Sequence, residues 1–172
     1  MTRPHDISEA LPAATFALLG YCQRHNWAGH DPYDALNSRL FSLLPPLDSR
    51  IPRLALTQIL KRSPVNIRRL LLIPETQNPK ALGVFLAALV RLDRLGLLPG
   101  EDLPGKMVQN LVNLRAKDTP YWSWGYSFPW QTRTIIVPRG APNLVCTTFI
   151  ANLPACRWPN RCGSAARSRW SI

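Results

Sequence analysis

The chain has 172 residues, of which 46% are hydrophobic and 18% are charged, which is typical of a globular protein and excludes a disordered chain. The longest apolar run, 81–90, is far shorter than a membrane-spanning helix, and the N-terminal residues do not resemble a secretion signal. We therefore expect a cytoplasmic protein with one main domain and no membrane span.

The net charge is +11, from 21 Lys and Arg residues against 10 Asp and Glu residues. The last twenty residues, 153–172, contain four of the arginines and no acidic residue, so the remaining chain is basic as well. A basic protein favours an anionic partner such as nucleic acid, a lipid surface or an acidic glycan. The same charge also suits a simple solvated surface.

Apolar residues recur at helical spacing through most of the chain. Seven helices are predicted, at 7–22, 32–43, 52–62, 64–73, 79–95, 104–117 and 143–152. Three of them begin with a capping residue before a proline: Asp31–Pro32, Ser63–Pro64 and Asn78–Pro79. Only Thr134–Val137 alternates as a strand would. Short links between amphipathic helices predict an all-α fold of antiparallel helical hairpins.

The four cysteines do not follow the spacing of a zinc site, so we expect reduced thiols, no metal and no cofactor. Cys22 and Cys146 lie in apolar helical stretches, which predicts that both are small core residues. The sequence contains no glycine-rich nucleotide loop, serine elbow or H-E-x-x-H motif.

The stretch between the last two predicted helices, 119–143, is unusually aromatic and long for a loop. Its rings belong to Tyr121, Trp122, Trp124, Tyr126, Phe128 and Trp130. Two interpretations are open. The rings can pin the loop onto the helix ends as a structural plug. Alternatively, some rings can form a stacking platform, with Gln131, Arg133 and Arg139 supplying directed hydrogen bonds.

Residues 153–172 do not continue the helical pattern. They combine Arg, Trp, Pro, Cys and Gly without an apolar period or caps. One hypothesis is that a frameshift near Asn152 replaced the native continuation, and the alternative is a basic arm that binds nucleic acid or an acidic surface. We therefore divide the chain into a partial helical domain, 1–152, and an irregular basic tail, 153–172, which is expected to be out of frame.

Three motifs resemble a poorly characterised bacterial family that is associated with exopolysaccharide and glycan biosynthesis. They are 124–133 (WGYSFPWQTR), 138–143 (PRGAPN) and 30–37 (HDPYDALN), within a resemblance that covers about 20–152. Members of this family have an α/α-toroid, the six-hairpin arrangement of many glycosidases and polysaccharide lyases. The resemblance implies that this chain contains only the first part of the ring. It would then be an inactive fragment of a protein for polysaccharide biosynthesis or processing.

In a toroid, ligands lie at one end of the ring, where the loops between helices meet. The resemblance therefore implies that the start of the second predicted helix and the aromatic loop together bind an acidic glycan or oligosaccharide. The substrate-binding residues expected on this basis are Tyr33, Asp34, Trp124, Tyr126, Trp130, Gln131, Arg133 and Arg139.

No residue is assigned a catalytic role from the sequence. Asp31 and Asp34 could form the carboxylate pair of a glycosidase, but two acids in the first turn of a helix are more often caps. A lyase would instead need a Tyr or His base and an Arg beside a uronate. These residue types are provided by Tyr33, Tyr126, His30 and Arg133.

A second class of function is a basic helical module that binds nucleic acid or another anionic surface. It rests on the basic body, on Lys61–Arg62 and Arg68–Arg69, and on the tail. The basic residues are scattered, however, and no recognition-helix pattern is evident. An incomplete ring would also leave apolar hairpin faces uncovered, which predicts self-association.

Overall fold

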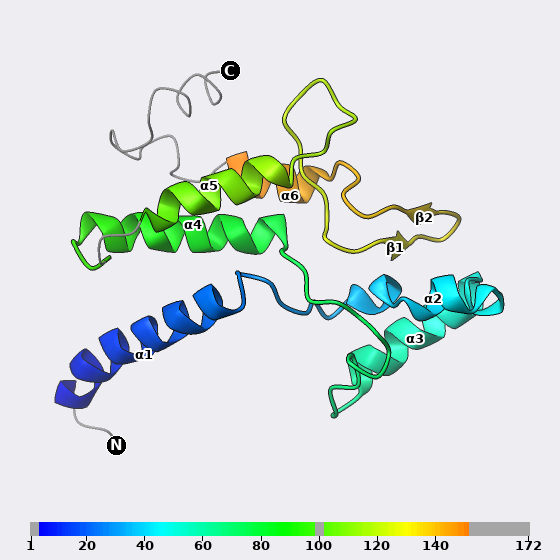
Figure 1. Cartoon of the computed structure of the whole chain (residues 1–172), viewed down its shortest axis with the longest axis horizontal. Helices are drawn as coiled ribbons and strands as arrows, with labels where there is room; N and C mark the ends of the chain where they lie inside the picture. The colour runs from blue at the N-terminus through cyan, green and yellow to red at the C-terminus, as the bar shows by residue number, and fades with distance from the viewer. Residues whose placement is uncertain (1–3, 99–101, 152–172) are drawn as a thin grey trace.

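The computed structural model describes residues 4–98 and 102–151, so the predicted tail, with Cys156, Cys162 and the proposed frameshift, lies outside the described residues. In chain order the elements are α1 (Pro4–Arg24), the 3-10 helix η1 (Asp34–Asn37), α2 (Leu40–Leu43), η2 (Pro45–Leu47), α3 (Arg50–Arg62), α4 (Pro79–Arg94), α5 (Leu103–Asn113), β1 (Trp130–Gln131), β2 (Ile136–Val137) and α6 (Leu144–Ala151) (Figure 1). The described chain is mostly helical, as predicted.

The predicted helix over 79–95 is confirmed as α4, and its ends follow from two residues. The side chain of Asn78 accepts a hydrogen bond from the backbone N–H of Lys80, at 3.0 Å, and so caps the first turn. Gly96, at a φ of +68°, ends the helix in a left-handed conformation that favours glycine. Predicted helices also match α1, α3, α5 and α6, although α5 ends at Asn113 and not at Lys117.

The prediction of one helix over 32–43 is wrong, because the segment divides into η1 and α2. Ser38 separates them in an extended conformation, and its hydroxyl donates to the carbonyl oxygen of Leu71 at 2.6 Å. Asp31 is not a helix cap in this segment. Its side chain accepts from the backbone N–H of Tyr33, at 3.0 Å, in a local turn.

The predicted helix over 64–73 is also wrong, since these residues form turns. Leu72 has a φ of +52°, and the N–H of Ile73 donates to the carbonyl oxygen of Arg68 at 3.0 Å. This is the hydrogen bond that closes a helix C-terminus, so the segment stops after a single turn.

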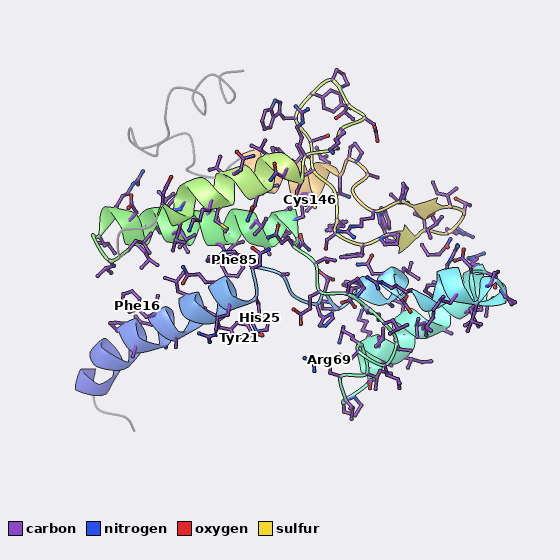
Figure 2. The ribbon with its side chains drawn as sticks, viewed as in Figure 1. Phe16, Tyr21, His25, Arg69, Phe85 and Cys146 are labelled. Atoms are coloured by element: carbon purple, nitrogen blue, oxygen red, sulfur yellow. The ribbon has the colours of Figure 1, made fainter. Side chains whose placement is uncertain are left out.

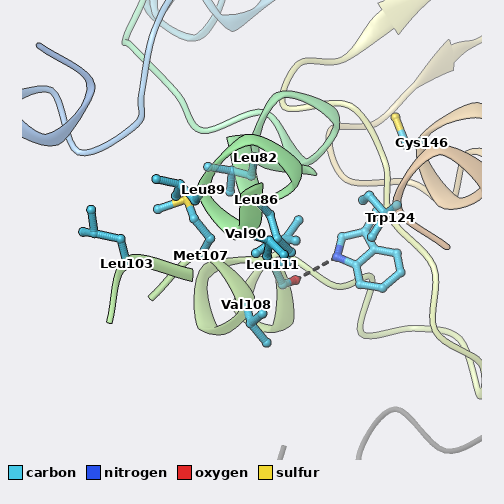
Figure 3. Packing of buried hydrophobic residues seen from close by; sticks show 11 residues of the cluster. Leu82, Leu86, Leu89, Val90, Leu103, Met107, Val108, Leu111, Trp124 and Cys146 are labelled. Atoms are coloured by element: carbon cyan, nitrogen blue, oxygen red, sulfur yellow. Dashed lines mark hydrogen bonds between the residues drawn. The ribbon is translucent and has the colours of Figure 1, made fainter. Parts of the chain in front are cut away.

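The main core lies between α4 and α5, with residues from the aromatic loop and α6 added at one end (Figure 3). Its fully buried members include Leu82, Leu86, Val90, Met107 and Leu111. Their spacing of four residues within each helix places them on one face of that helix, as the sequence predicts. A smaller cluster of Ala35, Leu60 and Ile73 joins η1 to α3 and the turn that follows it.

Helix α1 lies apart from the α4–α5 pair along most of its length (Figure 1). It exposes the large apolar side chains of Leu11, Phe16, Leu18 and Tyr21. Among the described residues, no helix combines the length and the apolar character needed to cross a membrane. The strand-like segment at Thr134–Val137 corresponds in part to β2, which pairs with β1 in an antiparallel ribbon.

Candidate functional site

The aromatic loop is held against the start of α6 by a short backbone pairing. The N–H of Asn143 donates to the carbonyl oxygen of Trp124 at 2.9 Å, and the N–H of Gly140 donates to that of Tyr126 at 3.0 Å. Gly125 lies between these two bonds, where a Cβ atom would overlap the carbonyl oxygen of Ala141. A residue without a side chain is therefore required at position 125, which explains the glycine in the motif.

Trp124 belongs to the core and not to a ligand surface. Its side chain is 2% exposed, and its indole N–H donates to the carbonyl oxygen of Leu111 at 2.7 Å (Figure 3). Because its ring has no face open to a ligand, the expected stacking role of Trp124 does not agree with the structure. For this residue, the interpretation of the loop as a structural plug describes the packing.

The next aromatic residues of the motif form a column with Tyr33. The rings of Tyr126 and Phe128 are stacked with centroids 5.3 Å apart, and those of Phe128 and Tyr33 with centroids 6.5 Å apart. Phe128 is buried, whereas Tyr33 is 48% exposed. The amino group of Lys61 lies over the Tyr33 ring, 4.9 Å from its centroid. The column thus joins the aromatic loop to η1 and α3.

This column borders an open pocket of 570 Å³, which we call the aromatic pocket. Four of the predicted site residues line it, namely Tyr33, Tyr126, Trp130 and Gln131. The other lining residues are Asp31, Pro32, Leu36, Leu54, Thr57, Asn78, Lys80, Phe128, Pro129 and Asn143. Its volume and its mixture of rings with a few polar groups are typical of a small-molecule site.

Two helices begin at the aromatic pocket. Asn78 caps α4 and Asn143 caps α6, where its side chain accepts from the N–H of Val145 at 3.0 Å. Both asparagines line the pocket, together with Lys80 of the first turn of α4. Helix N-termini carry partial positive charge, so this wall favours an anionic group.

Asp34 does not line the aromatic pocket, contrary to its expected role in binding substrate. It is 1% exposed, and its carboxylate lies 3.1 Å from Nε of Arg68 and 3.0 Å from Nδ1 of His30. A buried carboxylate with these partners is a structural ion pair. Asp31 does line the pocket, where its carboxylate accepts from the side-chain amide of Asn78 at 3.3 Å.

Arg133 and Arg139 are both exposed, and neither lines the aromatic pocket. Arg133 lies in the turn between β1 and β2, where the N–H of Thr132 donates to the carbonyl oxygen of Ile135 at 2.8 Å. Arg139 lies between β2 and Gly140. The positions of these two arginines therefore do not support the expected hydrogen bonds to a ligand in the pocket.

Burial raises the pKa of Tyr126 above its ordinary value, and the nearby charges of Cys146 and Asp31 raise it further. Burial also raises the pKa values of Cys22 and Cys146, and for Cys146 the positive charge of Lys80 acts in the opposite direction. Both cysteines are buried free thiols, as predicted. Within the part of the chain that the structure describes, no three His, Cys, Asp or Glu residues gather as metal ligands would.

Sequence reasoning missed Asn78, Lys80 and Asn143 as site residues. The sequence does indicate that both asparagines are helix caps, since Asn78 precedes a proline and Asn143 precedes an apolar helix. Their convergence on one pocket depends on how α6 packs against α4, which no local signal encodes.

Comparisons with models of known protein families, with curated proteins and with solved structures found no match for this chain.

Proposed function

We propose that this protein binds an acidic oligosaccharide in the aromatic pocket. The observation that carries the proposal is the convergence of two helix caps, Asn78 and Asn143, on a pocket that also has Tyr126 and Trp130 in its wall. Rings and a positive wall together suit a ligand with apolar sugar faces and negatively charged groups.

The rings supply the contact for the sugar. Trp130 is 39% exposed and Tyr126 is half-buried, so both can present part of an aromatic face to the pocket. The C–H groups on one face of a pyranose are apolar, and covering them with an aromatic ring removes apolar surface from water. Gln131, whose side-chain oxygen lies 3.4 Å from a guanidinium nitrogen of Arg53, adds a polar edge.

The helix N-termini and Lys80 supply the contact for the acidic group. A favourable charge at a helix N-terminus contributes about 0.3–1 kcal/mol at an exposed site and up to about 2 kcal/mol when partly buried. The carboxylate of Asp31, which also lines the pocket, is engaged within the protein, since it accepts from Asn78 and from the N–H of Tyr33. A carboxylate, sulfate or phosphate on the sugar would complete the balance of charge.

The pocket supports binding and not glycoside hydrolysis. Hydrolysis by the usual mechanisms needs two carboxyl groups that flank the scissile bond. Among the described residues that line the pocket, Asp31 is the one carboxylate, because Asp34 is buried with Arg68 and His30. We therefore assign no catalytic residue and propose a binding role.

We further propose that the pocket belongs to a carbohydrate-associated α/α-toroid protein of polysaccharide biosynthesis or processing, of which this chain is an incomplete part. The resemblance in the aromatic motif supports this assignment. The close packing of α4 on α5, which Figure 1 shows side by side, is the kind of contact from which such a ring is built. Translating the other reading frames past codon 152 tests it, since a ring requires further amphipathic helices there.

The experiment is a calorimetric titration with trigalacturonate and with a neutral trisaccharide, maltotriose. We expect binding of trigalacturonate only. Trp130→Ala should weaken it about tenfold through the loss of ring contact. Lys80→Gln should weaken it about threefold to tenfold, and more at low salt.

Arg91→Gln is the matched control for Lys80→Gln. Arg91 is an exposed cation of the same helix, eleven residues from Lys80 and so about 16 Å away along α4. It should leave the affinity unchanged. Equal losses in both variants would mean that net charge and not the pocket attracts the ligand, and equal binding of both trisaccharides would refute the acidic specificity.

The nucleic-acid alternative rests on the basic body of the chain, which includes Lys61–Arg62, Arg68–Arg69 and other basic residues of α3, and on the tail. Two of these cations are engaged within the protein, since Arg53 pairs with Asp48 at 2.6 Å and Arg68 pairs with Asp34. A titration of duplex DNA at several salt concentrations tests this alternative. A steep salt dependence with no binding of trigalacturonate would favour it over the proposed function.

A further inference from the structure

A second pocket, of 310 Å³, lies where the C-terminal end of α1 meets α4. We call it the apolar pocket. Trp27 and Phe85 form its walls with their rings in an edge-to-face contact, at a centroid distance of 5.0 Å. Figure 2 shows Phe85 on the side of α4 that faces α1. Leu18, Cys22 and Ala81 add further apolar surface.

One residue in the wall of the apolar pocket has a buried hydroxyl group without a partner. Ser127 lines it, is 5% exposed, and has no hydrogen-bond partner for its Oγ among the described residues. A buried hydroxyl is normally bonded, because losing its hydrogen bonds to water is unfavourable. Because this oxygen is itself inaccessible, the hydroxyl belongs to the packed wall of the pocket and offers no polar contact to a ligand.

The two pockets are neighbours that share two lining residues. Asp31 and Asn78 line both of them, and the side chains of these two residues are hydrogen-bonded at 3.3 Å. The short segment from Tyr126 to Ser127 likewise contributes one residue to each pocket. A ligand that fills the aromatic pocket thus has an apolar space directly beside it.

We infer that the ligand is an acidic glycoside with an apolar aglycone, whose sugar occupies the aromatic pocket and whose aglycone occupies the apolar pocket. This inference rests on the proposed function of the aromatic pocket. The apolar pocket has room for a bicyclic aromatic group or a short alkyl chain. Apolar surface predominates in its lining, although His30, Asp31, Thr76 and Asn78 contribute polar groups, so the pocket suits an apolar group better than a bare sugar.

The test compares three probes by calorimetry on the unaltered chain: 4-methylumbelliferyl β-D-glucuronide, methyl β-D-glucuronide and free 4-methylumbelliferone. The aromatic glucuronide should bind at least about tenfold more tightly than the methyl glucuronide, because only its aglycone can enter the apolar pocket. Equal affinities for the two glucuronides would overturn the inference and leave the proposed function standing. Binding of free 4-methylumbelliferone with no binding of either glucuronide would refute the proposed function, and this inference with it.

A variant that fills the apolar pocket locates the effect. Ala81→Phe places a ring in this pocket, and Ala88→Phe places the same ring on an exposed position of the same helix. The first should abolish the tenfold gain and keep the affinity for methyl glucuronide, whereas the second should change neither. A gain that survives in Ala81→Phe would overturn the assignment of the aglycone to this pocket. The comparison of the two glucuronides on the unaltered chain does not depend on how either variant folds.

Discussion

Removing the unpartnered hydroxyl of Ser127 should stabilise the protein, although most substitutions of buried residues destabilise it. Its residue is 5% exposed, and its Oγ makes no hydrogen bond within the described chain. Leaving a buried polar group unsatisfied costs about 1–3 kcal/mol, and Ser→Ala removes only one oxygen atom. Ser127→Ala should therefore raise the free energy of unfolding by about 1 kcal/mol, which raises Tm by roughly 2–4 °C for a chain of this size.

Thermal and urea unfolding of the ligand-free protein measure this change, with Ser123→Ala as the matched control. Ser123 is equally buried, but its hydroxyl lies 3.0 Å from that of Thr119. Its removal should lower the free energy of unfolding by about 0.5–1.5 kcal/mol. If both variants lose stability alike, the Ser127 hydroxyl has a partner in solution, and the argument from an unsatisfied buried group fails.

Three further predictions concern the surroundings of the two pockets. Gly125→Ala should lower the free energy of unfolding by at least about 2 kcal/mol in urea titrations, because its Cβ meets the Ala141 carbonyl, whereas Gly29→Ala, with open space around it, should stay within about 0.5 kcal/mol. Asp34→Asn should lower the free energy of unfolding by about 2 kcal/mol at neutral pH, since it removes the buried charge partner of the Arg68 guanidinium. The urea midpoint should fall accordingly, and an unchanged midpoint would contradict a structural ion pair. The raised pKa of Tyr126 means that this group ionises first in the unfolded chain, so stability should fall as the pH rises above 10, and less steeply in Tyr126→Phe. Parallel alkaline unfolding curves for the two proteins would refute that contribution.

The helices that the sequence predicted well are those whose signals agree with one another. In α4 an asparagine cap, a proline in the first turn, an apolar stripe and a terminal glycine all favour the same bounds. The segment 32–43 carries an equally good start signal, yet the Ser38 hydroxyl bonds to Leu71, more than thirty residues away, and interrupts it. A tertiary contact of this kind cannot be read from local periodicity, which explains the error.

The site was predicted in part for the same reason. Part of the aromatic motif lies in the wall of the candidate pocket, where Tyr126, Trp130 and Gln131 are lining residues. The sequence could not separate these residues from Trp124, because all belong to one short aromatic run. Which ring faces the core depends on the pairing of the loop with the start of α6. The same pairing brings the cap Asn143 to the pocket, a role that its own neighbours in the sequence do not indicate.

The two interpretations of the aromatic loop describe different residues of one rigid segment. Trp124 is fixed in the core by its bond to Leu111, and Tyr126, two residues later, lines the aromatic pocket. Gly125 holds the backbone between them against residues 140–141, which leaves little freedom for one ring to move without the other. A change in the core at Trp124 should therefore displace Tyr126 and weaken ligand binding even where the protein stays folded. The buried ring of Trp124 fixes the position of Tyr126 in the pocket wall. The stability of the core and the affinity of the pocket for its ligand are therefore coupled through this segment.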